Sequence, residues 1–407
     1  MKMTIEVLTR PERGTVPHGT GFWLTAYAFA VTMAFSAVPT PLYVDYQHRD
    51  HFSAATVTVV FAVYALGVVA SLLLVGHVSD RFGRRRVLVP AVLVSVLAGF
   101  VFLDWPTLPG LLLARVLQGL SVGAITATAT VHLAELHRAA RPEAGRRRAE
   151  IVAVAANLGG IGLGPLVSGL LADVAADPLR LPYLVVSVLL VLAAIGLSLV
   201  PETAPVLDDL GPYRPQRVRV PVGERGLYYA AALTAFSALA VFGLFTSVTP
   251  TLLTDMLDAP SHTLTGAVAF ATFAAGATGQ VLLARRPPRR TLTAGSAAVA
   301  MGLAVLVASV YASSLAGFLL GGVVAGAGAG LLFAAGVAVV SGLAGATGRA
   351  EALAGFFIAG YVGLAVPVLG LGLATRVFGL TGALVAFVVV VVALGVGSAL
   401  AAVRRLR

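Results

Sequence analysis

The chain has 407 residues, of which 58% are hydrophobic and 11% are charged, and its mean hydropathy is +0.94. A soluble globular domain carries about a quarter charged residues, so this composition excludes a water-soluble protein and indicates an integral membrane protein. Cysteine is absent, which excludes disulfides, thiolate catalysis and cysteine-ligated metals. The formal net charge is +10, but the arginines lie in short segments between apolar runs, which indicates membrane topology rather than nucleic-acid binding.

Twelve apolar segments are long enough to cross a bilayer, which takes about 20 residues for roughly 30 Å of hydrocarbon. We therefore predict an all-α integral membrane fold with twelve transmembrane helices. The first 21 residues lack the apolar core of a cleavable signal peptide, so we expect the first span to act as its own insertion signal. The predicted spans are residues 22–44, 55–75, 87–103, 109–134, 151–171, 182–200, 227–249, 263–283, 292–312, 315–341, 353–374 and 380–402.

The basic residues gather on one side of these spans. If both termini lie inside, twenty-four of the 28 basic residues are cytoplasmic, and Arg115 lies within a span. The other three, Arg49, Arg180 and Arg376, lie outside. Since Lys and Arg concentrate on the cytoplasmic side, we predict that both termini are cytoplasmic. All basic residues except Lys2 are arginine, a bias that favours a GC-rich bacterial genome and hence the inner (plasma) membrane of a bacterium.

The longest polar gap covers residues 201–226 and divides six spans from six. An arrangement of six plus six, with both ends inside, is what two parallel repeats related by an axis along the membrane normal would give. We therefore predict an N-terminal six-helix bundle at residues 1–201, a cytoplasmic central loop at 202–226, and a C-terminal six-helix bundle at 227–407.

A dense cluster of charge follows the second span, and its pattern is G-x-x-x-D-R-x-G-R-R. This pattern resembles the loop that the major facilitator superfamily carries between its second and third helices. The resemblance implies a twelve-helix transporter in which Asp80, with Arg81 and Arg84, locks the two halves together in the outward-facing state. The corresponding loop of the second half, 284–290, lacks the acid and the glycines. The candidate switch residues are Gly76, Asp80, Arg81, Gly83, Arg84 and Arg85.

Arg115 lies within the fourth span, roughly 9 Å from its middle at 1.5 Å per residue. A charge at this depth costs at least a few kcal/mol in lipid and normally faces a cavity or a partner. With Gln118 and Gly119 it forms R-x-x-Q-G, which resembles a fourth-helix motif linked to proton coupling in the family. The resemblance implies a coupling role for Arg115 and Gln118, and the alternative is an arginine that snorkels to the outer surface.

The fifth span is rich in glycine and contains one proline. Small residues let helices approach closely, and proline permits a kink. The run resembles the family's G-x-x-x-G-P-x-x-G-G motif, with Ser168 in place of one glycine, and the resemblance implies export by antiport. The residues concerned are Gly160, Gly164, Pro165 and Gly169.

None of the 18 acidic residues lies in the middle of a predicted span, whereas many drug exporters of this family carry a carboxylate deep in the first or fourth helix. The candidate proton carriers are Asp45, expected in an outer vestibule near Arg115, and Glu135, one helical turn from His132 at the inner side. The alternative for both is a solvated helix end. The absence of a buried acid argues against a carrier of dications or polyamines and favours a neutral, amphipathic or anionic substrate.

The substrate cavity of such a transporter is expected near the middle of the membrane, between the two halves. Aromatic and amide side chains of spans 1, 5, 7 and 11 are the candidates, and the alternative for each is a packing role. These candidates are Tyr27, Phe35, Asn157, Phe245 and Tyr361.

We predict a secondary active transporter that exports a small amphipathic compound in exchange for protons by alternating access. It is expected to act as a monomer in the lipid bilayer, without a cofactor or a metal. The alternatives are a proton-coupled importer or a uniporter of a small metabolite and, more remotely, a membrane sensor without transport or a polytopic membrane enzyme. Seven scattered histidines without paired carboxylates argue against an enzyme, and the chain has no G-x-x-x-x-G-K-[ST] loop for ATP.

Overall fold

The computed structural model describes residues 15–76, 78–204, 215–221, 223–283, 286–345 and 348–406. Across these ranges the regular structure is helical, without an assigned strand, which confirms the all-α prediction. The predicted positions of the two chain ends, and parts of the loops 202–226 and 284–290, lie outside the described residues.

The elements of the first half begin at His18. They are α1 (His18–Ala37), α2 (Tyr43–Asp50), α3 (Ala54–Leu74), α4 (Val78–Phe82), α5 (Arg84–Asp104), α6 (Leu108–Ala140), α7 (Arg147–Val154), the π-helix η1 (Ala155–Gly159), α8 (Gly160–Val174) and α9 (Leu181–Ser198). Those of the second half are α10 (Arg225–Ser247), α11 (Thr249–Leu257), α12 (His262–Leu283), α13 (Pro288–Tyr311), α14 (Leu315–Leu343) and α15 (Arg349–Arg405).

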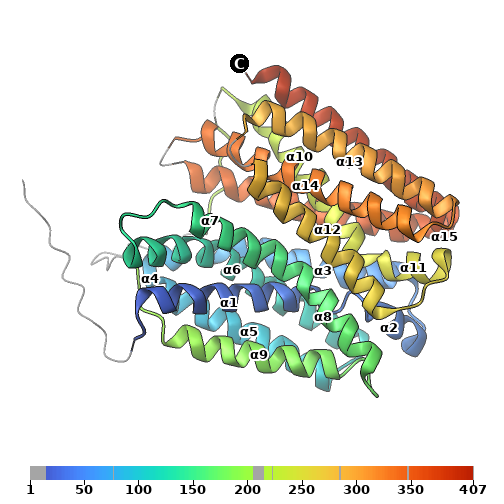
Figure 1. Ribbon diagram of the computed structural model, residues 1–407, viewed down its shortest axis with the longest axis horizontal. Helices are drawn as coiled ribbons and strands as arrows, with labels where there is room; N and C mark the ends of the chain where they lie inside the picture. Colours follow the sequence, from blue (N-terminus) through green and yellow to red (C-terminus); the bar gives the residue numbers. More distant parts are fainter. Residues whose placement is uncertain are drawn as a thin grey trace, which may run out of the picture.

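Eleven helices within the described ranges are long and apolar enough to cross a membrane. The last of them, α15, has 57 residues and would measure about 86 Å if straight, nearly three times the hydrocarbon thickness. Gly379 interrupts it with φ 66° and ψ 175°, so that α15 consists of two helices that meet at a kink (Figure 1). The described ranges therefore contain twelve spans, as predicted.

The first span ends earlier than predicted. Helix α1 ends at Ala37, residues 38–42 form turns, and the short helix α2 follows. Pro39 and Pro41 explain this difference, because proline lacks a backbone N–H and disfavours helical geometry in the residue before it. In the second half, α10 is likewise followed by a short helix, α11. The same break after the first span of each half agrees with an internal repeat.

The helices form two groups that lie side by side (Figure 1). Elements α1 to α9 make up one group and α10 to α15 the other. Helix α8 packs against α12, and α3 packs against α15, so these two pairs form the interfaces between the groups. The bounds predicted for the two bundles and the central loop stay a prediction.

The two ends of the molecule differ. One end carries α4, the start of α7 and the start of α15, and we refer to it as the arginine-rich end. The other end carries α2 and α11, and we refer to it as the opposite end. The two groups of helices diverge toward the arginine-rich end and approach each other at the opposite end (Figure 1).

Gly379 generates the first testable prediction, because its φ is one that residues with a side chain rarely adopt. We expect Gly379→Ala to lower the free energy of unfolding by about 1–3 kcal/mol. Gly397→Ala is the control, since Gly397 is helical and a Cβ there would meet no atom within 4 Å. The midpoints of thermal unfolding in detergent are compared for the two variants. Equal midpoints would contradict the prediction that residue 379 requires the backbone conformation of glycine.

Candidate functional site

Arg84 is the centre of a charge cluster at the arginine-rich end. Its side chain is only 8% exposed. The guanidinium donates to the Ser79 hydroxyl at 2.8 Å and to both oxygens of Glu135, at 3.1 and 3.3 Å. It also forms an ion pair with Asp80, whose side chain is 64% exposed. Two predicted site residues, Asp80 and Glu135, therefore share one buried arginine, and all of these groups belong to the first half.

Glu202 holds the start of α5 in place. Its carboxylate accepts the backbone N–H groups of Arg84 at 2.7 Å and Arg85 at 3.0 Å. An anion at a helix N-terminus satisfies unpaired N–H groups and gains from the helix dipole. Gly83 is required here for two reasons: its φ is 105°, and an added Cβ would lie 2.4 Å from a Glu202 oxygen. The second glycine of the charged motif thus makes room for Glu202.

Thr203 extends this cluster toward His132. The Thr203 hydroxyl donates to Glu135 at 2.6 Å, and Nδ1 of His132 lies 2.9 Å from the same hydroxyl oxygen. Because the hydroxyl proton points to Glu135, Nδ1 is the donor to Thr203. The His132 ring is fully buried, and its Nε2 has no hydrogen-bond partner. The predicted proximity of Glu135 and His132 is therefore part of a network that also involves Thr203 and Arg84.

The remaining switch residues lie around this cluster. Arg85 donates to the backbone oxygen of Val200 at 3.2 Å, Arg81 is part of α4, and Gly76 follows the end of α3. Asp80 forms its ion pair with Arg84, within the same half. That these residues lock the two halves together stays a prediction.

Arg115 is completely buried, with 1% of its surface exposed. Its guanidinium donates to the backbone oxygen of Ser36 at 2.7 Å, to Gln118 Oε1 at 2.9 Å and to the Tyr43 hydroxyl. Gln118 in turn donates to the backbone oxygen of Phe35 at 2.9 Å. These partners are carbonyl, amide and hydroxyl oxygens, so the charge is stabilised by dipoles and by nearby aromatic rings, including Tyr43 at 5.8 Å.

The carbonyl oxygens that Arg115 and Gln118 bind belong to the last turn of α1. The last carbonyls of a helix have no partner within it, and a cation there gains from the helix dipole. Ser168 of α8 assists by donating to the backbone oxygen of Val38 at 2.8 Å. Gly119 brings α6 close to α3, because a Cβ there would lie 2.2 Å from the backbone oxygen of Tyr64. In this structure the R-x-x-Q-G segment binds the backbone oxygens at the C-terminal end of α1.

The glycines of the predicted fifth span allow close packing at two interfaces, one with α1 and one with α12. Cβ atoms at Gly160 and Gly164 would lie 2.6 and 2.0 Å from backbone oxygens of α1, whereas one at Gly169 would lie 2.2 Å from the backbone oxygen of His262 in α12. Pro165 lies at the same contact, since a Cβ on Gly266 would come within 2.3 Å of its oxygen. The span itself is not a regular helix, because the π-helix η1 separates α7 from α8.

Asp45 lies at the opposite end, in α2. We expected it near Arg115, but its carboxylate contacts His262, whose Nε2 is 2.8 Å from Asp45 Oδ2. Arg115 instead contacts Tyr43, two residues earlier. His262 and Asp173 complete this cluster, at 2.8 Å from each other.

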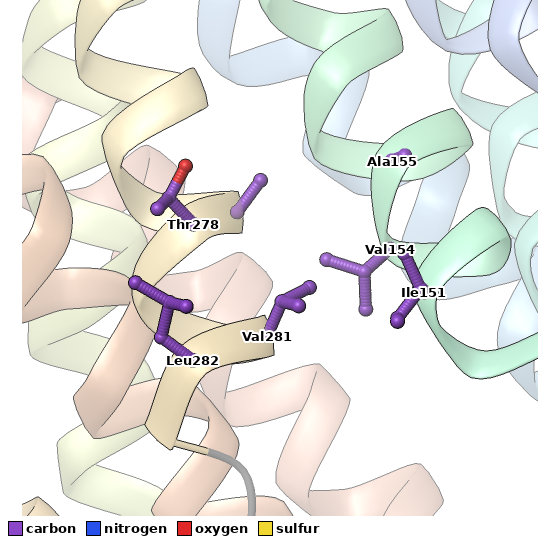
Figure 2. A pocket seen from close by; sticks show the side chains of 7 residues that line it. Ile151, Val154, Ala155, Thr278, Val281 and Leu282 are labelled. Atoms are coloured by element: carbon purple, nitrogen blue, oxygen red, sulfur yellow. The ribbon is translucent and has the colours of Figure 1, made fainter. Parts of the chain in front are cut away.

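A cavity of about 230 Å³ lies between the two halves (Figure 2), and its lining residues belong to the part of the molecule nearer the arginine-rich end. One wall comes from α7 and η1 and the other from α12, and Thr278 supplies the only side-chain hydroxyl among its lining residues. These are Ile151, Val154, Ala155, Ala277, Thr278, Val281 and Leu282.

Of the five residues predicted to face a substrate, none lines this cavity among the described residues. Phe35 and Phe245 are fully buried and pack edge-on against Phe102 and Phe318. Tyr27 donates its hydroxyl to the backbone oxygen of Leu189 at 3.2 Å. Asn157 is in η1 and Tyr361 is in α15, and both are half-buried. Their roles in binding stay a prediction.

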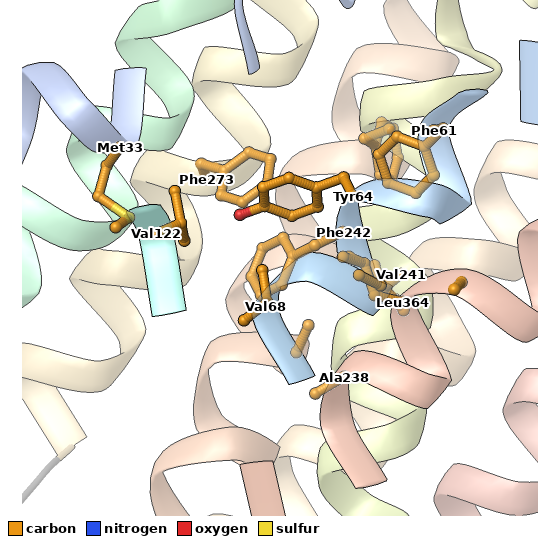
Figure 3. Close-up of a cluster of buried hydrophobic side chains, with 14 of the residues drawn as sticks. Met33, Phe61, Tyr64, Val68, Val122, Ala238, Val241, Phe242, Phe273 and Leu364 are labelled. Atoms are coloured by element: carbon orange, nitrogen blue, oxygen red, sulfur yellow. The ribbon is translucent and has the colours of Figure 1, made fainter. Parts of the chain in front are cut away.

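An apolar cluster joins the halves in the middle of the molecule (Figure 3). Phe242 and Phe273 stack with their centroids 4.6 Å apart, and side chains of α1, α3 and α6 come from the first half. Apolar contact is not directional, so this interface can separate without breaking specific bonds. The labelled members are Met33, Phe61, Tyr64, Val68, Val122, Ala238, Val241, Phe242, Phe273 and Leu364.

Four residues of these clusters were not among the predicted site residues. Glu202 and Thr203 follow the sixth span, and Asp173 and His262 lie just beyond predicted spans. Each was visible as a polar residue at a helix end. Their contacts join positions as far apart as Asp45 and His262, and no local pattern encodes such contacts.

Comparisons with known proteins agree with the fold. The model of the Major Facilitator Superfamily matches residues 21–311. Multidrug resistance protein MdtL of Klebsiella pneumoniae is 24% identical over 223 residues, which cover 53% of this chain and 54% of that protein. The chain thus matches about half the length of this curated relative.

Solved structures resemble the whole chain. The human organic anion transporter MFSD10 (TETRAN) has a TM-score of 0.69 and 17% identity, and the match covers 95% of this chain and 100% of that one. A bacterial homolog to the human lysosomal transporter Spinster, in an inward-facing and unoccupied conformation, has a TM-score of 0.74 and 15% identity, with coverage of 95% and 98%. At these identities the likeness concerns the fold.

The position of Glu202 generates a second prediction. We expect Glu202→Gln to lower the free energy of unfolding by about 1–2 kcal/mol, because the neutral amide loses two charge-assisted bonds at the start of α5. Glu143→Gln is the matched control, since Glu143 is exposed in a loop. Thermal unfolding in detergent compares both with the wild type. An unchanged midpoint for Glu202→Gln would show that this carboxylate does not hold the helix.

Proposed function

Because the chain belongs to the Major Facilitator Superfamily, whose model matches residues 21–311, we propose that it is a secondary transporter that exports a small amphipathic compound in exchange for protons. The family and the similar solved structures are transporters, so the chain is a multi-pass membrane transporter rather than an enzyme. Export is the finer proposal, and it is supported by the similarity to a multidrug resistance protein and by the glycine–proline run of the fifth span.

The single observation that carries the proposal is the unequal closure of the two ends. At the opposite end, the Thr40 hydroxyl donates to the backbone oxygen of Thr246 at 3.0 Å, and His262 bonds across the interface. Toward the arginine-rich end, the cavity lies between α7 and η1 on one side and α12 on the other. If the arginine-rich end is cytoplasmic, this state is open to the inside and closed to the outside, as an exporter needs when it takes up its substrate.

The lining of the cavity favours an amphipathic or neutral substrate. Its lining is aliphatic apart from Thr278, and such a surface favours apolar groups. The entrance lies between α7 and α12, and Leu282 at its edge is 72% exposed. A compound that partitions into the inner half of the bilayer would meet this edge.

Proton coupling is proposed to act through the charged residues described above. A proton that enters the cell contributes roughly 2.3 kcal/mol per 100 mV of membrane potential. Arg115 is proposed to be a positioning residue, because it binds the C-terminal end of α1. Glu135, beside Arg84, is a candidate proton carrier. A proton-coupled importer or a uniporter is the alternative function, and the experiment below separates it from export by antiport.

Proton movement in proteoliposomes tests this function. With an imposed pH gradient and lipophilic compounds added singly, we expect at least one compound to dissipate the gradient only when the protein is present. We expect Arg115→Lys to reduce this rate about tenfold or more, because an ammonium group cannot replace the planar guanidinium and each charge-assisted bond is worth about 1.5–3 kcal/mol.

Arg180→Lys is the matched control, since Arg180 is exposed before α9, and its rate should equal that of the wild type. If labelled compounds cross the membrane without proton flux, the coupling proposal is wrong and the uniporter replaces it. If Arg115→Lys transports at the wild-type rate, the positioning role of Arg115 is wrong.

A further inference from the structure

His262 bridges the two halves at the opposite end. It is the first residue of α12, and its Nε2 lies 2.8 Å from Asp45 of α2 while its Nδ1 lies 2.8 Å from Asp173 of α8. We refer to these three residues as the His262 cluster. The ring is 24% exposed and the two carboxylates are 25% and 34% exposed. Water on this side of the molecule can therefore exchange protons with the cluster.

The hydrogen bonds define which atoms carry protons. Asp173 also accepts the backbone N–H groups of His262 at 3.3 Å and Thr263 at 3.0 Å, and the Ser261 hydroxyl at 3.3 Å. It thus caps the N-terminus of α12 from the other half, a position that favours an ionised carboxylate. An ionised carboxylate only accepts, so both ring nitrogens must donate. The closed cluster therefore contains the protonated imidazole, held between two anions.

Other ionisable groups surround the cluster without replacing these bonds. On α2, His48 is exposed and Arg49 pairs with Asp50 at 2.7 Å. Helix α11 packs against α2 and α12 and carries Asp255, with Asp258 directly after it. Past α8, the connection to α9 contains Asp177 and Arg180. Among the described residues, no group of three or more His, Cys, Asp or Glu is arranged to hold a metal ion.

We propose that the His262 cluster is a proton-binding site that closes the opposite end of the transporter, and that closure takes up one proton from the water on that side. The proposal rests on the alternating access proposed above, and it places the predicted proton carrier Asp45 in a proton site with His262 and Asp173, apart from Arg115 and Glu135. A histidine released into water has a pKa of about 6.5. Above that pH the free ring is neutral, so closure must bind a proton and becomes less favourable as the pH rises.

The sign of the pH dependence follows from this uptake. Below about pH 6.5 the ring is already charged in the open cluster, and the equilibrium no longer depends on its protonation. Above it, the ratio of closed to open molecules falls by at most tenfold per pH unit, because one proton is bound. An acidic exterior would thus favour the state that is open to the inside, in which an exporter binds its substrate.

Distance measurements between spin labels test the proposal directly. Glu150→Cys and Leu282→Cys place one label at each side of the cavity, on exposed positions of α7 and α12, and the chain has no native cysteine. In lipid nanodiscs between pH 5.5 and 8.5, without substrate, we expect the long distance to dominate at acidic pH. The population with a short distance should grow as the pH rises above about 6.5.

Two substitutions of His262 should remove this pH dependence in opposite ways. His262→Arg keeps a permanent cation between the carboxylates, and we expect the long distance at every pH. His262→Gln lacks the cation, and we expect a larger population with the short distance at every pH. His48→Gln is the matched control, because it removes an exposed histidine of α2 outside the cluster, and it should keep the wild-type profile.

A wild-type distance distribution that does not change with pH would overturn the proposal, and so would a wild-type profile in His262→Gln. If His262→Gln does not yield a monodisperse protein, His262→Arg and Asp45→Asn still decide the question, since Asp45→Asn should reduce the pH response while the Asp173 cap remains. The measurement requires neither substrate nor a proton gradient. Its failure is therefore distinguishable from a failure of proton-coupled export, which the proteoliposome assay detects.

Discussion

The structure depends on which groups bind the backbone carbonyls at the C-terminal end of α1, where the first span is interrupted. A helix that ends among other spans leaves backbone carbonyls without partners, and an apolar surrounding makes each of them costly. Here the end at Ala37 is held by Arg115 and Gln118 of α6 and by Ser168 of α8. The two terminal nitrogens of the buried guanidinium bind oxygens, whereas its Nε has no hydrogen-bond partner among the residues that the structure describes. An arginine that is 1% exposed is thus stabilised by hydrogen bonds to uncharged oxygens of Ser36, Tyr43 and Gln118.

The interface between the halves combines two kinds of contact. In the middle it is apolar, where the stacked pair Phe242 and Phe273 of the second half meets apolar side chains of α1, α3 and α6 (Figure 3), and such contacts can part and re-form without directional bonds. At the opposite end it is polar and directional, because His262 bonds to Asp45 and Asp173 at once. The apolar part permits rocking, whereas the polar part determines which end is closed. The Arg84 cluster, in contrast, stabilises the first half internally.

The sequence predicted the spans better than the contacts. Hydropathy located twelve spans because the bilayer requires long apolar helices, and the charged motif located the Arg84 cluster. Hydropathy alone placed the end of the first span near residue 44, although Pro39 and Pro41 carried the signal for an earlier break. The depth of Arg115 was visible, but its partners were not, since they depend on where α1 ends. The pairing of Asp45 with His262, 217 residues apart, depends on the packing of the two halves and has no local signature.

The central claim is that the two halves must separate at the opposite end during each transport cycle. Thr58 and Gly372 are suited to test it, because they face each other across the α3–α15 interface, where a Cβ on Gly372 would lie 3.0 Å from the Thr58 Cβ. A disulfide joins Cβ atoms about 3.5–4.5 Å apart, so the cross-link requires α3 and α15 to move apart by about 0.5 Å or more. The measurement is transport by Thr58→Cys/Gly372→Cys in proteoliposomes before and after oxidation. The account predicts that the oxidised protein does not transport and that reduction restores the rate. Transport that continues at the same rate through the cross-linked protein would contradict alternating access.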